Sequence, residues 1–396
     1  MDAVIVATAR SPIGRANKGS LAGVRADDLA AQIVGKALAK VPALDPATLD
    51  DLILGCAQPA GEQGYNLGRQ VAMHLGFDMV PGTTVNRYCA SSLQAIRMAF
   101  HAIRAGEGHA FVAAGAEIVS HYGAGKSDGM PGTRNPRWPQ RTATLPWSDP
   151  RERGELPDVY IAMGETAENV ASLCGISRRE QDEFAVRSQN NAEKAQADGF
   201  WDLDITPVTL PDGTELRRDD GPRPGVTLDK VAALQPVFRP DGTVTAGNCC
   251  PLNDGAAALV ILSAARAREL GLAPLARIVA TGVSALSPEI MGLGPVEASR
   301  RALAHAGMSI GDVDLIEINE AFAAQVIPSY RQLGADPERV NVHGGAIAVG
   351  HPFGMTGARI ATTLLNGLIH RDATIGLETM CTAGGQGMAL IVERLS

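Results

Sequence analysis

Cys89 stands in the stretch VNRYCASSLQ, residues 85–94, where an extended pattern gives way to a helical one. Free backbone N–H groups and the positive end of the helix dipole meet at the first turn of a helix, and both favour a thiolate. Cysteine is also among the most frequently buried residue types, so the same position suits a packing residue. These ten residues alone predict either a nucleophile or a core residue.

Two glycine-rich stretches later in the chain offer further reactive groups. His351 lies among the glycines of GGAIAVGHPFGMTGAR, residues 344–359. Glycine lets the backbone approach a ligand closely, and histidine titrates near neutrality, so His351 could act as a base or donate to an oxyanion. Cys381 precedes GGQG in LETMCTAGGQGMALIV, a pattern that also fits a simple β-hairpin.

A third stretch, EINEAFAAQ at 317–325, sets Asn319 and Glu320 where a strand-like run changes into a helical one. Asn319 is either a polar residue of a site or only the N-cap of the following helix.

The elements around these residues alternate between short apolar strands and helices. The sequence predicts strands at 3–8, 50–56 and 109–117, and a helix over 27–41 that starts at Asp27 or Asp28. The helix after Cys89 is expected to end near Gly106. This rhythm is typical of a layered α/β fold.

The same alternation of strands and helices recurs in the last third of the chain, together with some identical residues. ARIVATGVS (276–284) repeats much of AVIVATARS (3–11), and a helix from Pro295 to Gly307 follows. DLIEI (314–318) then matches DLILG (51–55), and the pair VN recurs at 340–341 after 85–86. Because the matches keep their order, we interpret the chain as two copies of one domain.

Loops that follow the strands of two equivalent domains can meet, and ligands in α/β folds bind at strand ends. Cys89, Asn319, His351 and Cys381 all lie at such ends or turns. A cysteine, a histidine and a second cysteine in one pocket form a set suited to acyl transfer through a thioester.

Between the copies the composition changes to glycine, proline and charge, which predicts an inserted subdomain with one clear helix over 177–199. The run NDGAAALVILS (253–263) is expected to return as the last strand of the first copy. The predicted division is a first half (1–117 plus 246–270), a loop domain (118–245) and a second half (271–396).

The formal net charge of −8 argues against nucleic acid or an anionic membrane as the partner, so any phosphate-bearing ligand needs a local basic patch. Six cysteines without CxxC pairs argue against a disulfide framework and a structural zinc site. The apolar run near Met1 is too short and strand-like for a signal peptide or a membrane span, which predicts a cytoplasmic protein.

The sequence resembles the thiolase family over its whole length. VNRYCASSLQAI resembles the family's nucleophile motif, NEAFA its asparagine motif, GGAIAVGHPFGMTGAR its histidine motif and CTAGGQG its second-cysteine motif. The resemblance implies two βαβαβαββ halves in a five-layered αβαβα sandwich, with the inserted loop domain (118–245) binding coenzyme A. It also implies a homodimer or homotetramer that uses coenzyme A and acetyl-CoA as substrates and needs no metal or other cofactor.

By the same resemblance, Cys89 is the thiolate that takes up the acyl group and His351 removes its proton. Asn319 would hold a water that completes an oxyanion hole with His351. Cys381 would exchange a proton with the acetyl-CoA enolate. The backbone N–H groups of Cys89 and Ala383 would form a second oxyanion hole, although the family usually has Gly where Ala383 stands.

The family's substrate contacts map onto Arg223, Lys230, Cys250, Met163 and Phe322. Arg223 matches a position near the nucleotide of coenzyme A, and Lys230 replaces a common Ser; both could instead be solvated loop charges. Cys250 stands where a Ser often contacts the pantetheine arm, which puts that hydrogen bond in doubt.

The expected activity is reversible thiolytic cleavage of 3-ketoacyl-CoA to acetyl-CoA and a shortened acyl-CoA, as in fatty acid β-oxidation. Short-chain enzymes of the family often have His immediately before a Met-Gly pair. This chain has Ala162 before Met163-Gly164, which favours substrates with longer acyl chains. The alternatives are an acetoacetyl-CoA-forming acetyl-CoA C-acetyltransferase, a thiolase-fold binding protein without turnover, and the ketoacyl synthase or hydroxymethylglutaryl-CoA synthase type, which lacks the second cysteine.

Overall fold

One ten-stranded sheet runs through the molecule, seen in a computed structural model that describes residues 1–124, 132–142 and 146–396. Its strands are β1 (Ala3–Arg10), β2 (Gly14–Arg15), β3 (Asp51–Gly55), β4 (Gly82–Val85), β5 (Ala110–Ile118), β8 (Asn253–Ser263), β9 (Ala276–Ala285), β10 (Leu315–Ile318), β11 (Ile375–Thr382) and β12 (Gln386–Arg394). The short strands β6 (Val208–Thr209) and β7 (Glu215–Leu216) form a separate hairpin.

The helices of the described residues follow the alternation that the sequence predicts. They are α1 (Ala26–Ala39), α2 (Leu67–His74), α3 (Ser91–Ala105), α4 (Met163–Cys174), α5 (Arg178–Ala197), α6 (Phe200–Asp204), α7 (Leu228–Ala232), α8 (Ala264–Glu269), α9 (Gly294–Ala306), α10 (Ala323–Leu333), α11 (Ala346–Val349) and α12 (Thr356–His370).

The strand order confirms the internal duplication. From the centre outward the first half reads β1, β8, β5, β3, β4, and the second reads β9, β12, β11, β10, with Val340 bridging to Ile316 in parallel where the first half has β4 beside β3. β1 and β9 pair antiparallel and join the halves. β8 pairs with β1 and β5, so the predicted return of 253–263 to the first copy is also confirmed.

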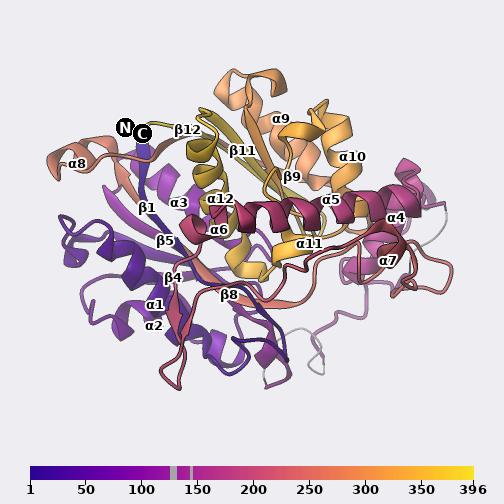
Figure 1. Ribbon diagram of the computed structural model, residues 1–396, viewed down its shortest axis with the longest axis horizontal. Coiled ribbons are helices and arrows are strands. Elements are labelled where there is room, and N and C mark those ends of the chain that lie inside the picture. Colours follow the sequence, from indigo (N-terminus) through magenta and orange to yellow (C-terminus); the bar gives the residue numbers. More distant parts are fainter. Residues whose placement is uncertain (125–131, 143–145) are drawn as a thin grey trace.

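The two halves of the sheet form two β layers. Helices cover both faces of each half, which gives five layers. In β3, Leu52 and Leu54 pack in the same core as α1 and α2, whereas Ile53 between them packs with α3 and α12. α9 and α10 cover the outer face of the second half. Figure 1 shows α1 and α2 on one side, α3 and α12 in the middle and α9 with α10 on the other side. The predicted five-layered sandwich is therefore confirmed.

Some local expectations need correction. Arg25 is the N-cap of α1, and Asp27 and Asp28 lie inside its first turn, where acidic side chains favour the helix dipole. α9 begins at Gly294, one residue before the predicted start at Pro295, which lies in its first turn. It ends before Gly307 as predicted, because glycine adopts the left-handed C-cap.

The inserted region 118–245 contains α4 to α7, and its predicted long helix is α5, which begins with a capping box of Ser177 and Glu180. Residues 125–131 and 143–145 of the insertion lie outside the described part of the chain. The division into three domains at the stated boundaries stays a prediction. None of the helices within the described residues is long and apolar enough to span a bilayer.

Candidate active site

A tight turn between β4 and α3 presents Cys89. The turn is held because the Asn86 side chain accepts from the Tyr88 N–H (2.7 Å) and the Ser91 hydroxyl donates to the Tyr88 carbonyl (2.6 Å). Tyr88 itself takes a positive φ of 45°, an uncommon conformation for a non-glycine residue. Cys89 is partly buried and lines a cavity of about 430 Å³ together with Ala383 and other residues.

Burial and then the charge of Glu117 raise the pKa of the Cys89 thiol to about 12, although the backbone N–H groups of Cys89 and Ala383 act to lower it. These are the two N–H groups expected to form the second oxyanion hole, and both lower the pKa of the Cys89 thiol. α3 begins only at Ser91, and desolvation of the Cys89 thiol outweighs the effect of the helix start, so the thiol needs a base to take its proton.

His351 is buried and held as a neutral imidazole. Its backbone N–H donates to Asn253 Oδ1 (2.9 Å), and its Nδ1 lies 2.7 Å from the Thr356 hydroxyl. That hydroxyl donates its one proton to the Pro352 carbonyl (2.7 Å), so Nδ1 must carry the imidazole proton. Burial and then the charge of Arg359 lower the pKa of His351 to about 3. Nε2 therefore bears a lone pair.

Asn319 sits beside that lone pair. Its Nδ2 lies 3.2 Å from His351 Nε2, and its buried Oδ1 has no hydrogen-bond partner among the described residues. The alternative that Asn319 is an N-cap is wrong, because α10 begins at Ala323 with Phe322 as its N-cap. The asparagine motif thus places a polar side chain against the histidine loop.

Two buried carboxylates position the loops that carry these groups. Glu320 accepts from the Ser188 hydroxyl (2.6 Å), from Asn341 Nδ2 (2.8 Å) and from the Ile347 N–H (3.1 Å), which ties α5 to the histidine loop. Glu117 accepts from the backbone N–H groups of Ala57 (2.7 Å) and Gly354 (2.8 Å) and from the Tyr122 hydroxyl (2.7 Å). Burial raises the pKa of both carboxyls.

Cys381 lies near the end of β11, directly before the hairpin turn to β12 in which Gly384 and Gly385 take positive φ. The hairpin alternative is therefore right, and it does not compete with a role in the site. Burial and then a charge on Cys89 raise the pKa of the Cys381 thiol.

An apolar cluster gathers most of the expected substrate contacts near Cys381. Phe322 and Cys381 are buried in it, with Met163 and Cys250 packed against it. The Cys250 N–H donates to the Ala321 carbonyl (3.0 Å), and charges on Cys89 and Cys381 contribute to raising the pKa of its thiol after burial. Cys89, Cys250 and Cys381 are thus close enough to influence one another.

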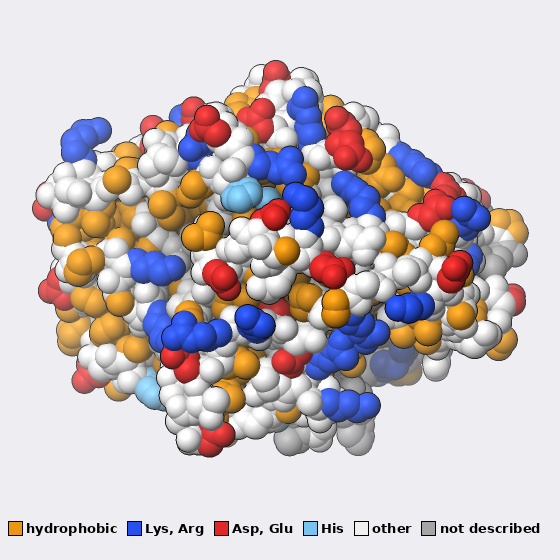
Figure 2. Space-filling model, viewed as in Figure 1, with side chains coloured by type: hydrophobic (Ala, Val, Ile, Leu, Met, Phe, Trp, Pro, Cys, Tyr) orange, Lys and Arg blue, Asp and Glu red, His pale blue; other side chains and the backbone are white. Residues whose placement is uncertain are grey.

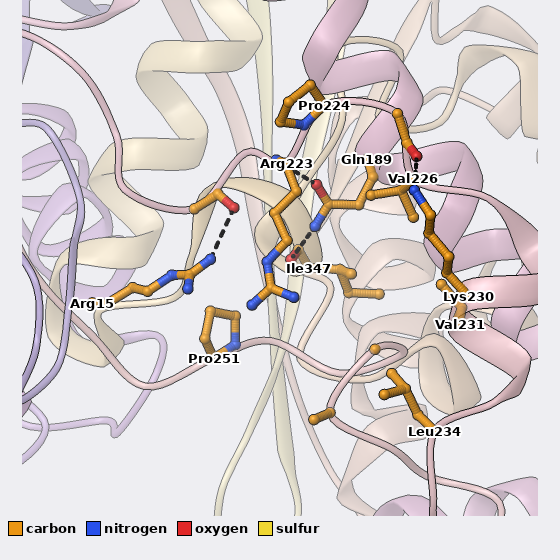
Figure 3. A pocket seen from close by; sticks show the side chains of 14 residues that line it. Arg15, Gln189, Arg223, Pro224, Val226, Lys230, Val231, Leu234, Pro251 and Ile347 are labelled. Carbon is orange, nitrogen blue, oxygen red and sulfur yellow. Dashed lines mark hydrogen bonds between the residues drawn. The ribbon is translucent and has the colours of Figure 1, made fainter.

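A second cavity, of about 300 Å³, is lined by Arg223, Lys230 and Arg15. Burial and then the charge of Arg15 lower the pKa of Arg223, and the Arg15 Nε is buried without a hydrogen-bond partner among the described residues. Figure 3 shows both guanidinium groups extending toward the same space, with the Arg223 N–H held by Gln189 (3.1 Å). Sequence reasoning missed Arg15, which is far from Arg223 in the chain.

The lining of this second cavity carries positive charge, which suits an anion. Its described lining includes neither Asp nor Glu. Figure 2 shows Lys and Arg side chains interspersed with Asp and Glu over the face in view, without one continuous basic surface. Among the residues that the structure describes, no group of three His, Cys, Asp or Glu side chains could hold a metal ion.

The sandwich of two related halves, with a partly buried Cys89 after β4 and a buried His351–Asn319 pair in the second half, defines a class of α/β protein. Models of the thiolase N-terminal domain and the thiolase C-terminal domain match residues 3–265 and 272–394. The chain belongs to the thiolase family.

Individual relatives agree with this assignment over nearly the whole chain. A 3-ketoacyl-CoA thiolase of Bacillus subtilis is 42% identical, with 99% of both chains covered, and a beta-ketoadipyl-CoA thiolase of Escherichia coli is 45% identical, with 98% of both covered. The crystal structure of the Bacillus anthracis acetyl-CoA acetyltransferase superimposes with a TM-score of 0.86 at 40% identity, covering 100% of this chain and 99% of that one.

Proposed function

We propose that the protein catalyses reversible, CoA-dependent thiolysis of 3-ketoacyl-CoA through an acyl group on Cys89. The observation that carries the proposal is the chain from Thr356 through His351 to Asn319, which leaves a neutral imidazole with its lone pair on Nε2. A buried thiol with a pKa near 12 needs such a base to lose its proton as it attacks.

In the first half-reaction the Cys89 sulfur attacks the 3-keto carbon while its proton passes to His351. The tetrahedral oxyanion then collapses, the bond between carbons 2 and 3 breaks, and the acyl group stays on Cys89 as a thioester. The leaving acetyl-CoA enolate takes the proton of the Cys381 thiol. Preorganised donors at the enolate oxygen supply several kcal/mol to this step.

In the second half-reaction the Cys381 thiolate removes the proton of an incoming CoA thiol. The CoA sulfur attacks the acyl-Cys89 carbonyl, and the N–H groups of Cys89 and Ala383 stabilise the oxyanion. Collapse releases the shortened acyl-CoA and returns the proton from His351 to Cys89. No cofactor beyond coenzyme A takes part in either step.

Coenzyme A spans both cavities in this proposal. Its phosphates lie between Arg15 and Arg223, and the segment that lines this cavity at Gly247 and Pro251 leads to Cys250. Since the charge of Cys89 acts on Cys250, the two thiols are close, and the pantetheine arm would run past Cys250 to the nucleophile. Met163 and Phe322 would flank that arm or the acyl chain.

The assignment is tested by incubation with a 3-ketoacyl-CoA or acetyl-CoA, followed by peptide mass spectrometry. An acyl adduct on Cys89 that free CoA removes is expected. A fold used only for binding would give no adduct and no CoA-dependent loss of acetoacetyl-CoA. A chain-length series then separates an acetoacetyl-CoA-forming enzyme, which turns over only the four-carbon substrate, from the 3-ketoacyl-CoA thiolase favoured here.

We further propose a homodimer or homotetramer located in the cytoplasm, on the strength of the family resemblance. Size-exclusion chromatography with light scattering on the purified chain tests the assembly, and a monomer would contradict it.

A further inference from the structure

The cavity that contains Cys89 has a charged side chain that the reaction steps above do not use. Arg134 lines this cavity, and no other Lys, Arg, Asp or Glu does so among the described residues. Tyr160 and Thr133 also line the cavity, and Val159, Ile161 and Phe353 give it apolar walls. The described lining of the cavity therefore combines apolar walls and uncharged polar groups with one cationic position.

Hydrogen bonds and an aromatic ring hold the guanidinium of Arg134 in place. Its Nη2 donates to the Asp158 carboxylate (3.1 and 3.3 Å) and to the Pro139 carbonyl (3.2 Å). Its Cζ lies 4.8 Å from the centre of the Tyr160 ring. All the hydrogen bonds that Arg134 makes to described residues run from Nη2. Nε and Nη1 make no hydrogen bond to a described residue, and the side chain is 43% exposed.

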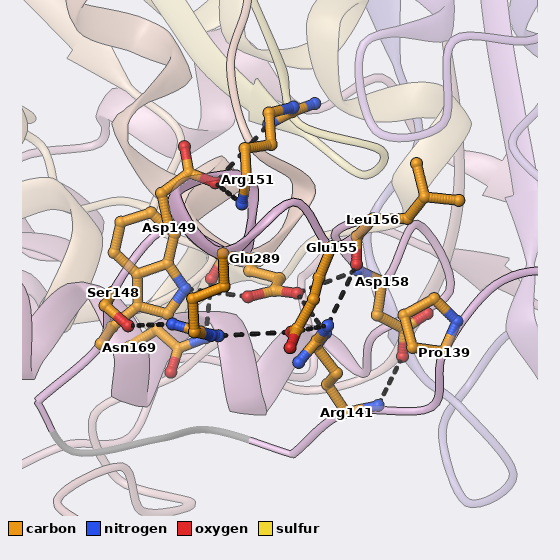
Figure 4. A network of polar contacts seen from close by, with 12 residues as sticks. Pro139, Arg141, Ser148, Asp149, Arg151, Glu155, Leu156, Asp158, Asn169 and Glu289 are labelled. Atoms are coloured by element: carbon orange, nitrogen blue, oxygen red, sulfur yellow. Dashed lines mark hydrogen bonds and ion pairs between the residues drawn. The ribbon is translucent and has the colours of Figure 1, made fainter.

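Asp158 is rigid because a wider network fixes it. It is 1% exposed and accepts from the backbone N–H groups of Arg141 (2.9 Å) and Tyr160 (2.9 Å), while its own N–H donates to Glu289 (2.9 Å). Glu289 also pairs with Arg141 at 3.3 Å and belongs to the η5 turn (Pro288–Leu293) of the second half. Figure 4 shows Asp158, Arg141, Glu155 and Glu289 joined in this network. The network orients Arg134 without lining the cavity itself.

The charge of Arg134 is not needed for the phosphates of coenzyme A. Arg15, Arg223 and Lys230 line the separate cavity that we assign to those phosphates, and Arg134 does not line it. The space beside Cys89 is where the acyl group of a covalent intermediate must lie. A cation in that space is matched by an anionic acyl end, because an apolar chain end would remove water from the exposed part of the guanidinium without replacing its hydrogen bonds.

We propose that the acyl pocket accepts 3-ketoacyl-CoA substrates whose acyl chain ends in a carboxylate, and that Arg134 is the residue that binds this carboxylate. The inference rests on the proposed thiolase activity and deepens it. An ion pair between Arg134 and the carboxylate, with hydrogen bonds from Nε or Nη1, selects such substrates over methyl-ended ones of equal length.

Two six-carbon 3-ketoacyl-CoA thioesters, one ending in a carboxylate and one in a methyl group, test the proposal by CoA-dependent thiolysis. The wild-type enzyme is expected to show a kcat/KM at least about tenfold higher for the carboxylate substrate, since the guanidinium is partly exposed and solvent weakens the ion pair. Arg134→Met, which keeps length but removes the charge, should lower the ratio of the two kcat/KM values by about tenfold or more.

Two further variants keep the test decisive. Arg134→Lys should keep part of the ratio, because a charge remains. Arg137→Met is the matched control, since Arg137 is an exposed arginine of the same segment that does not line the cavity, and the ratio should not change.

An equal loss on both substrates in Arg134→Met would overturn the proposal and leave Arg134 a structural role. A wild-type enzyme that prefers the methyl-ended substrate would overturn it as well. Failure of both substrates, with no acyl-Cys89, would instead reject the proposed activity.

Discussion

Replacing Thr356 by Val tests whether the protonation state of His351 is set by its neighbour. The Thr356 hydroxyl accepts from His351 Nδ1 at 2.7 Å and donates to the Pro352 carbonyl at 2.7 Å, and valine has a similar shape but neither function. The substitution leaves the imidazole either with an unpaired buried N–H or in the other tautomer. In that tautomer, Nε2–H points at the donating Nδ2 of Asn319 and cannot accept the Cys89 proton.

The size of the effect follows from those contacts. A buried N–H without a partner costs about 1–3 kcal/mol. If that cost falls on the step in which His351 takes the proton, acylation slows about tenfold to a hundredfold. Rapid-quench measurement of acyl-Cys89 formation from a 3-ketoacyl-CoA gives this rate directly.

Thr356→Ser is the matched control, since it keeps the hydroxyl and loses only a methyl group. Its acylation rate should stay within about threefold of the wild-type rate. An acylation rate in Thr356→Val equal to that of the wild type, in a protein with an unchanged thermal midpoint, would refute the argument that this hydroxyl selects the tautomer.

Three further outcomes are expected. Alkylation of Cys89 by iodoacetamide, followed by peptide mapping, should accelerate about tenfold per pH unit between about pH 7 and 9, because a thiol with a pKa of about 12 stays protonated throughout; a plateau below pH 9 would contradict the raised pKa. Cys381→Ala should still form acyl-Cys89 from acetyl-CoA but lose most carbon–carbon bond formation and cleavage, and unchanged acetoacetyl-CoA synthesis would exclude its proton-transfer role. Arg15→Ala and Arg223→Ala should each raise the KM for CoA about five- to thirtyfold (about 1–2 kcal/mol). Lys230→Ala should have a smaller effect, because its Nζ donates a hydrogen bond to the Gly225 carbonyl in an exposed loop. As the check, the KM for a pantetheine substrate without the nucleotide should be the same in these variants and in the wild type.

The sequence predicts the fold well wherever the pattern is local. Strands buried on both faces read as continuous apolar runs, and β8 spans the same residues as predicted. The duplication can be recognised in the sequence because equivalent strands of the two halves retain identical residues. The start of α1 was misplaced because two acidic residues stand near it, and an Asp in the first turn looks like an N-cap when only the sequence is known.

The site was predicted from motifs, and its supporting contacts were not. Arg15 meets Arg223 only through the fold, and Glu117 reaches Gly354 across a long sequence separation. Nothing periodic marks Arg134, which lies in a proline- and glycine-rich stretch. The sign of the Cys89 shift also depends on burial, which a helix-start rule does not include.

Gly344 gives the duplicated molecule a built-in asymmetry. It lies three residues beyond the Asn of the second VN pair, as Cys89 lies three residues beyond the Asn of the first. Gly344 takes a φ of +83°, and a Cβ there would come within 2.6 Å of the Ser188 carbonyl oxygen of α5. The inserted helix thus occupies the space in which a twin nucleophile would stand. Titration with a slowly turned-over acyl donor should therefore saturate at one acyl group per chain, although the scaffold has two equivalent halves.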